Sequence, residues 1–425
     1  TSGTTYNIYG NVFTCFTASY DVYPVYVSSV TTLSIYRNKI HNISYTGTGS
    51  NRVAAGMYIA ATTAYCYNNM VYDIKAPAAT STGTNVNSRG IQVAGGTNMY
   101  LFYNTVFLSY ISTGSTNQSA ALFVGSATPT IDLRNNVFVN TVDVTTGTRA
   151  VAFYRSFTAL TSISTNSNNN LYYAGTPGSK YLIHYDATNS DQTLSAYKTR
   201  FIARDQASVT EMPPFISITS PIDVHLQTGI PTFCEGSAVP VTTPVAITTD
   251  FDSDSRNATS PDIGADEFAG TAQTKYVSSL KVNIASTADI LMGSVNQEIL
   301  RIDINVVGSG GTLPLNKIIV TRWFSDWPPQ TAPDGVKLYR TANSTFSTAN
   351  LVGTAVDTTF DNINYDLPVG TSYFWVTYDI IPTGHGSVTA RINPSDGITI
   401  NNNPFTEFDG NPAGSRQIVG KVFSS

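Results

Sequence analysis

A six-residue phrase with an asparagine among apolar residues recurs through the first part of the chain. It reads IYGNVF, IYRNKI, CYNNMV, LFYNTV, LRNNVF and NNNLYY. Aligned on one asparagine of each phrase, the copies are 27, 31, 35, 31 and 34 residues apart. The aligned residues are Asn11, Asn38, Asn69, Asn104, Asn135 and Asn169. A period of about 20–50 residues indicates stacked structural repeats.

A second phrase precedes four of these asparagines. It reads GMYI from Gly56, GIQV from Gly90, ALFV from Ala121 and AVAF from Ala150. The apolar runs are short, alternate with polar residues and are rich in Val, Ile, Tyr and Phe, which is typical of β-strands. No stretch of this region has helical periodicity.

These two phrases favour one architecture. A chain that coils and returns above itself pairs each strand in parallel with its copy in the next turn. We therefore predict an all-β protein that begins with a right-handed parallel β-helix over residues 1–270, with turns over about 1–190 and a C-terminal cap over about 191–270. The asparagines are expected at tight corners, because Asn tolerates the left-handed backbone region. Their amides are expected to form a hydrogen-bonded ladder.

Charge is sparse and unevenly divided. Charged residues make up 12% of the chain, against about 25% in ordinary soluble domains. Residues 1–180 have nine basic and four acidic side chains, whereas the whole chain has a net charge of −5. A mildly basic rod is compatible with an anionic glycan partner. The basic residues are scattered, so we expect no nucleic-acid partner, and no apolar run is long enough for membrane insertion.

Five phrases follow the repeats in order: TLSAYKTRF, PPFIS, DVHLQTGIP, TTDFDSDSRN and SPDIGADEF. Together they resemble the closing segment of a family of secreted bacterial right-handed parallel β-helix proteins. With the repeats, the resemblance covers roughly residues 1–268. It implies an exported surface protein but no single activity. Arg256 beside Asp262, Asp266 and Glu267 indicates an ion-paired cap over the last turn.

Residues 271–425 follow a different pattern. In LRIDINV, Leu300, Ile302 and Ile304 alternate with polar residues, and further strand-like runs are separated by Gly, Pro and Asn turns. This predicts an immunoglobulin-like β-sandwich. The phrases SVNQEILRIDINV, LPVGTSYFWVTYDI and NPAGSRQIV are similar to the immunoglobulin-like domain at the N-terminus of some BNR-repeat neuraminidases. That domain also recurs in large surface proteins exported by the type IX system.

Two aspartates are the candidates for catalysis in the rod. An inverting glycosidase needs two carboxylates about 6.5–9.5 Å apart. Asp73 and Asp132 lie on different expected strands, two repeats apart, so we do not expect them to converge. We assign no catalytic residue.

Two other clusters are candidates for binding. Asp250, Asp252 and Asp254 alternate as in a calcium loop, but Ser255 and Pro261 replace the expected glycine and glutamate. An ion-paired surface without metal and a calcium site both stay open, and no other cofactor is expected. In RWFSDWPPQ, an expected loop, Trp323, Phe324 and Trp327 could stack on sugars, dock a partner domain or pack against the sandwich.

These features predict a non-enzymatic module of a large secreted or cell-surface protein. It would act as an adhesin or as a structural subunit of an extracellular appendage. Expected partners are the remainder of a longer parent chain, cell-surface glycans and other copies of the chain. The alternative is a polysaccharide-binding or polysaccharide-degrading β-helix protein.

Overall fold

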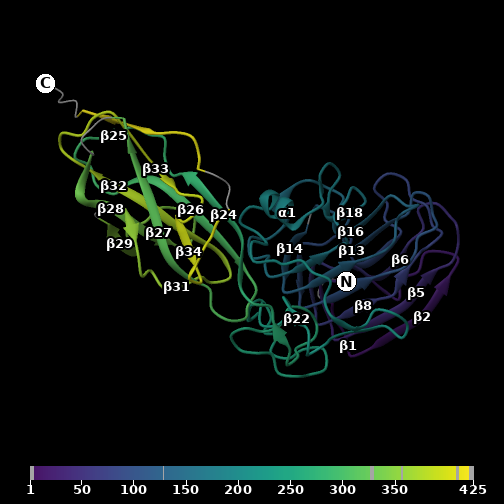
Figure 1. The fold of residues 1–425 in the computed structure, drawn as a ribbon. Helices are drawn as coiled ribbons and strands as arrows, with labels where there is room; N and C mark the ends of the chain where they lie inside the picture. The colour runs from purple at the N-terminus through teal and green to yellow at the C-terminus, as the bar shows by residue number, and fades with distance from the viewer. Residues whose placement is uncertain (1–3, 128, 326–329, 356–357, 408–410, 421–425) are drawn as a thin grey trace. The chain divides into compact units, whose positions relative to one another are not determined.

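The computed structural model describes residues 4–127, 129–325, 330–355, 358–407 and 411–420 (Figure 1). Nearly all of its elements are strands, and the chain divides into two compact units, residues 1–273 and 274–425. Parallel strands build the first unit and antiparallel sheets build the second. The predicted all-β fold class, a parallel β-helix followed by a sandwich, is confirmed.

Three parallel sheets, which we call A, B and C, form the β-helix. Sheet A contains β1 (Thr5–Tyr9), β4 (Thr32–Tyr36), β7 (Thr63–Tyr67), β11 (Asn98–Phe102) and β14 (Thr130–Arg134). Sheet B contains β2 (Val12–Ala18), β5 (Lys39–Tyr45), β8 (Met70–Tyr72), β9 (Ile74–Lys75), β12 (Thr105–Leu108), β15 (Val137–Asn140) and β17 (Leu171–Tyr173). Sheet C contains β3 (Val25–Ser28), β6 (Ala54–Ala60), β10 (Ser88–Val93), β13 (Gln118–Val124), β16 (Arg149–Arg155), β18 (Tyr181–Tyr185) and the antiparallel β19 (Ser190–Asp191).

Inward side chains stack in columns through the unit. Leu33, Ala64, Met99 and Ile131 occupy one register position of sheet A in successive turns, and each is fully buried. Because side chains alternate between the two faces of a strand, each turn repeats the same inward positions. The apolar core is therefore continuous from turn to turn. The second repeated phrase was expected to occur for the fourth time as AVAF from Ala150. This copy is two residues out of register, because Ala152 rather than Ala150 aligns with Ala121.

An asparagine ladder runs along the corner between sheets A and B. In each step the side-chain oxygen of one asparagine accepts hydrogen bonds from the backbone N–H and the amide of the asparagine one turn earlier. The ladder residues are Asn11, Asn38, Asn69, Asn104, Asn136 and Asn170. All except Asn11 are fully buried.

Two expectations about this corner were wrong. Asn135 and Asn169 precede the ladder residues by one position, so the predicted register fails in the last two turns. The left-handed backbone belongs to the residue before each ladder asparagine, so the predicted asparagines Asn135 and Asn169 have it, whereas Asn11, Asn38, Asn69 and Asn104 do not. We call the residues before the ladder asparagines the corner column: Gly10, Arg37, Asn68, Tyr103, Asn135 and Asn169, with φ between 51° and 65°.

The last turn is closed by residues 194–209, which include helix α1 (Leu194–Arg200). Asn170, the last ladder residue, donates to Asp205 Oδ1 at 2.7 Å, and its backbone N–H donates to Ser208 Oγ. Tyr197 and Phe201 pack beneath them in the buried core. This cap lies within the predicted range, but Arg256, Asp262, Asp266 and Glu267 are not part of it.

Residues 211–270, which we call the flank segment, instead run back along the side of the β-helix. They include β20 (Phe215–Ser217), β21 (Asp223–Leu226) and β22 (Pro231–Thr232), which pairs with β23 (Thr271–Ala272). Side chains of the corner column hold this segment by donating to its backbone carbonyls. The pairs are Arg37 with Phe251, Asn68 with Thr249, Tyr103 and Asn135 with Val239, and Asn169 with Ser237.

The second unit contains two antiparallel-rich sheets around one core, as expected of a β-sandwich. The first comprises β24 (Tyr276–Ile284), β26 (Gln297–Val307), β32 (Gly370–Ile380), β28 (Thr331–Thr341) and β29 (Leu351–Ala355). The second comprises β25 (Ile290–Leu291), β36 (Arg416–Val419), β33 (Ser387–Ile392), β27 (Pro314–Phe324), β34 (Ile398–Ile400), β35 (Asn403–Pro404), β30 (Thr359–Phe360) and β31 (Tyr365–Asp366). Leu300, Ile302 and Ile304 are fully buried, as their alternation predicts.

Candidate functional site

A column of mostly aromatic side chains follows the outer face of sheet C. One register position of each strand contributes to it, and the inward neighbours on either side are core residues such as Ile91 and Val93. Within it the rings of Tyr26 and Tyr58 stack with centroids 4.3 Å apart, and those of Tyr154 and Tyr185 lie 4.9 Å apart. The column comprises Tyr26, Tyr58, Gln92, Phe123, Tyr154 and Tyr185.

A pocket of about 560 Å³ opens where Gln92 interrupts this column. Tyr58 and Phe123 line it from the turns on either side, and the loop before β10 contributes Thr82 and Asn85. The Nδ2 of Asn85 is buried and has no hydrogen-bond partner within the described part of the chain. The pocket therefore combines aromatic rings with amide and hydroxyl side chains, while the Nδ2 atom of Asn85 itself is shielded from solvent.

A buried arginine supports the pocket from below. Arg89 donates to Gln92 Oε1 at 2.7 Å and to Asn85 Oδ1 at 2.9 Å, and its guanidinium lies 4.3 Å from the centre of the Phe123 ring. Burial lowers the pKa of Arg89 to about 10, so the group stays cationic at neutral pH. These hydrogen-bond partners are uncharged, so Arg89 makes the floor of the pocket electropositive, although the group is 6% exposed and the Asp21 carboxylate offsets part of its charge.

This combination suits sugar recognition. Amide and hydroxyl groups pair with the hydroxyls of a ligand, and aromatic rings provide flat apolar surfaces. The sequence did not indicate this pocket, although the second repeated phrase contains three of its lining residues. Position three of GMYI, GIQV and ALFV supplies Tyr58, Gln92 and Phe123.

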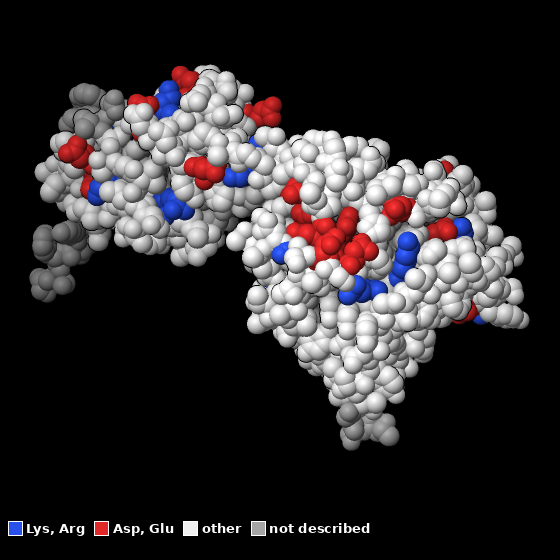
Figure 2. Space-filling model, turned by 90° about the horizontal axis from the view of Figure 1, so that it is seen from below, with Lys and Arg blue, Asp and Glu red and all other residues white. Residues whose placement is uncertain are grey.

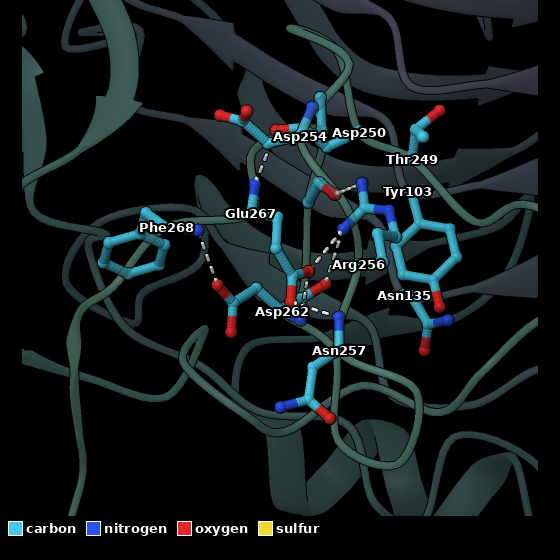
Figure 3. A network of polar contacts seen from close by, with 12 residues as sticks. Tyr103, Asn135, Thr249, Asp250, Asp254, Arg256, Asn257, Asp262, Glu267 and Phe268 are labelled. Carbon is cyan, nitrogen blue, oxygen red and sulfur yellow. Dashed lines mark hydrogen bonds and ion pairs between the residues drawn. The ribbon is translucent and has the colours of Figure 1, made fainter.

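Of the four residues predicted as an ion-paired cap, Arg256, Asp262 and Glu267 lie together in the flank segment (Figure 3), and Asp266 is also buried in this segment. Arg256 pairs with Glu267 at 3.1 Å, donates to Asn68 Oδ1 at 2.9 Å and lies over the Tyr103 ring. Asp262 accepts from the backbone N–H groups of Gly236 and Phe268, and Asp266 accepts from that of Leu226. These two aspartates thus order the backbone rather than pair with Arg256.

Asp250 and Asp252 of the candidate calcium loop have different partners. Asp250 is fully buried, and its two oxygens accept from the backbone N–H groups of Asp254 and Glu267. Asp252 points elsewhere and contacts His225 Nε2 at 2.9 Å. Among the described residues, the cluster with metal-ligand geometry includes only Asp252 of the three predicted aspartates.

The two carboxylates considered for catalysis have separate partners. Asp73 pairs with Lys75 at 2.9 Å, and Asp132 pairs with Arg134 at the same distance. Asp132 is almost fully buried on β14, where its partner Arg134 also donates to Thr243 O of the flank segment. Both carboxylates therefore take part in local ion pairs.

The expected aromatic loop of the second unit, residues 322–330, begins with the last three residues of strand β27. Trp323 and Phe324 end β27, Trp323 is 49% exposed, and Phe324 packs against the sandwich core near Tyr378. Trp327 lies outside the described residues. Trp323 is thus the predicted contact residue that the structure presents to solvent.

A buried charged network lies in the last turns of the β-helix, next to helix α1. Arg155 donates to His184 Nε2 at 3.2 Å and to Asp186, and the other ring nitrogen of His184 lies 2.9 Å from Asp191. Arg200 of α1 also pairs with Asp191. Burial lowers the pKa of His184. Burial alone would raise the pKa of Asp191, but hydrogen bonds from His184 and Arg200 outweigh it and hold the pKa at about 2.

We expect this network to make the β-helix unit acid-sensitive. Unfolded His titrates near about 6.5, above the folded His184, so the stability contributed by the neutral ring decreases as the pH falls below that value. Unfolded Asp titrates near about 3.9, so the contribution of Asp191 decreases between there and about 2. Urea unfolding from pH 8 to about pH 2 measures both effects. Asp191→Asn should flatten the pH dependence of the free energy of unfolding below about pH 4. An unchanged pH dependence in this variant would show that Asp191 does not contribute to the acid sensitivity.

Comparisons with known protein families and curated proteins identify no relative of this chain. No family model matches the chain, and no curated protein matches it. Among the described residues, no helix has the length and apolar character that crossing a membrane requires.

Proposed function

We propose that the β-helix unit is a glycan-binding contact module of a secreted or cell-surface protein with an adhesive or structural role. The pocket on sheet C carries this proposal, because Tyr58 and Phe123 flank amides held above the Arg89 cation. The stacked rings of Tyr26 and Tyr58 extend the contact surface to the preceding turn, because Tyr26 is 56% exposed, whereas Tyr154 is fully buried. A contact surface that spans more than one turn favours binding to a polymer over binding of one small molecule.

The positive charge under the pocket favours acidic polysaccharides over neutral ones. The described side chains that line the pocket are amides, hydroxyls, aromatic rings and an alanine methyl, with a glycine completing the wall. This set suits binding and orientation, and it supports a contact role over polysaccharide cleavage at this position. Secretion, a longer parent chain and contacts between copies belong to the same proposal and rest on the sequence resemblances.

We expect Phe123→Ala to weaken retention on an acidic polysaccharide by about tenfold, since a lost aromatic contact of about 1.4 kcal/mol corresponds to that factor. Affinity electrophoresis of the full chain measures the change. Tyr9→Ala, at an exposed aromatic residue on sheet A, is the comparison variant, and circular dichroism shows whether Phe123→Ala, at a position only 6% exposed, remains folded. Equal losses in both variants, or none in Phe123→Ala, would refute a site at this pocket.

A further inference from the structure

A histidine and two aspartates from separate stretches of the flank segment converge at one point. His225 belongs to β21, Asp252 follows the turn at Asp250, and Asp266 lies near the end of the segment. One ligand-type atom of each lies within 4.8 Å of the others. On the face shown in Figure 2, acidic side chains gather in one patch of the β-helix unit, with basic side chains beside it.

The orientation of His225 is fixed by a fourth residue. Its Nδ1 contacts Asp223 Oδ1, and this oxygen also accepts from the backbone N–H of His225. Nδ1 is thus held as a donor to Asp223, and Nε2 shares a proton with Asp252 Oδ2 at 2.9 Å, so a metal ion would displace that proton and take the Nε2 lone pair. A carboxylate behind the ring is the usual arrangement of metal-binding histidines.

The two carboxylates complete the coordination. Asp266 is 8% exposed; its Oδ2 accepts from the backbone N–H of Leu226, which fixes the carboxylate position. The Asp252 side chain is 49% exposed and can adjust. A tetrahedral metal with bonds of about 2.0–2.2 Å holds its ligands about 3.4 Å apart. The ligand atoms, which lie within 4.8 Å of one another, would therefore have to approach by at most about 1.4 Å.

We propose that His225 Nε2, Asp252 and Asp266 bind a divalent transition metal such as Zn²⁺, with Asp223 as a positioning residue and water completing the shell. Imidazole nitrogen favours zinc-like ions, whereas calcium prefers oxygen ligands alone. The metal would tie three stretches of the flank segment to one another. This inference is independent of glycan binding, because the pocket on sheet C shares none of these residues.

Calorimetric titration of the chelator-treated full chain with Zn²⁺ tests the site. We expect one saturable site per chain that also raises the melting temperature. His225→Ala and Asp252→Asn should each weaken binding at least tenfold, and Asp223→Asn by about 10–100-fold. His385→Ala, at an exposed histidine of the second unit, is the control and should change nothing.

Circular dichroism shows whether each variant is folded, and the exposed Asp252→Asn tests the site even if His225→Ala destabilises the unit. The proposal would be overturned by wild-type chain without saturable Zn²⁺ binding, or by unchanged affinity in both Asp252→Asn and folded His225→Ala. Tighter binding of Ca²⁺ than of Zn²⁺ would overturn it as well, since it would indicate an oxygen-only site.

Discussion

Arg256→Met should destabilise the flank segment by about 3–5 kcal/mol, because removing one partner of a buried ion pair leaves the other charge uncompensated. Glu267 would lose its cation, and Asn68 Oδ1 and Gly264 O would lose a shared donor. The methionine roughly preserves the volume over Tyr103. We expect faster amide hydrogen exchange over residues 237–268 and earlier proteolytic cleavage there, with the asparagine ladder still protected.

Arg37→Met is the matched control for this experiment. Arg37 also holds the flank segment, through one hydrogen bond from Nε to Phe251 O. Its loss should cost about 1 kcal/mol and loosen the residues around Phe251. If the two variants behave alike, or if Arg256→Met leaves exchange of the flank segment unchanged, the buried pair does not hold the segment.

Asn104→Ala should destabilise the β-helix unit by about 2–4 kcal/mol, because a buried polar group without a partner costs about 1–3 kcal/mol and a cavity adds to this. Asn104 Oδ1 accepts from the backbone N–H and the amide of Asn69, and its Nδ2 donates to Cys66 O and Asn136 Oδ1. Truncation leaves the Asn69 N–H without its acceptor inside the core. Urea unfolding followed by far-ultraviolet circular dichroism measures the loss.

Asn11→Ala provides the comparison within the same ladder. Asn11 is exposed and lies at the first turn, so water can replace its hydrogen bonds. We expect a loss below about 1 kcal/mol. Similar losses at both positions would show that the ladder does not derive its stabilisation from burial.

The fold could be predicted because its signal is periodic. Each turn repeats one asparagine and one pair of apolar runs, so the spacing alone indicates stacked parallel strands. The register of the asparagine phrase failed only where asparagines are adjacent, as in LRNNVF, because composition does not distinguish Asn135 from Asn136. The inward residues Phe138 and Tyr172, which follow the ladder asparagines by two positions, would have resolved it.

The sites depend on contacts that have no periodic signal. Arg256 and Asn68 are 188 residues apart, and the phrases around them do not indicate that they meet. The resemblance placed the flank segment after the last turn, but its hydrogen bonds go back to the second turn at Arg37. The calcium expectation used alternation along the chain, whereas Asp252 meets a histidine from another strand. These side chains meet only because the folded chain brings distant stretches of the sequence together.

Titration of the wild-type chain with matched acidic and neutral polysaccharides tests the proposed function most directly. Retention should be recorded together with new reducing ends and unsaturated products in the same samples. We predict saturable retention on acidic polymers that weakens with salt and produces no cleavage. Release of cleavage products that is lost in Asp73→Asn or Asp132→Asn would contradict the contact-module account, and so would absence of retention on every polymer.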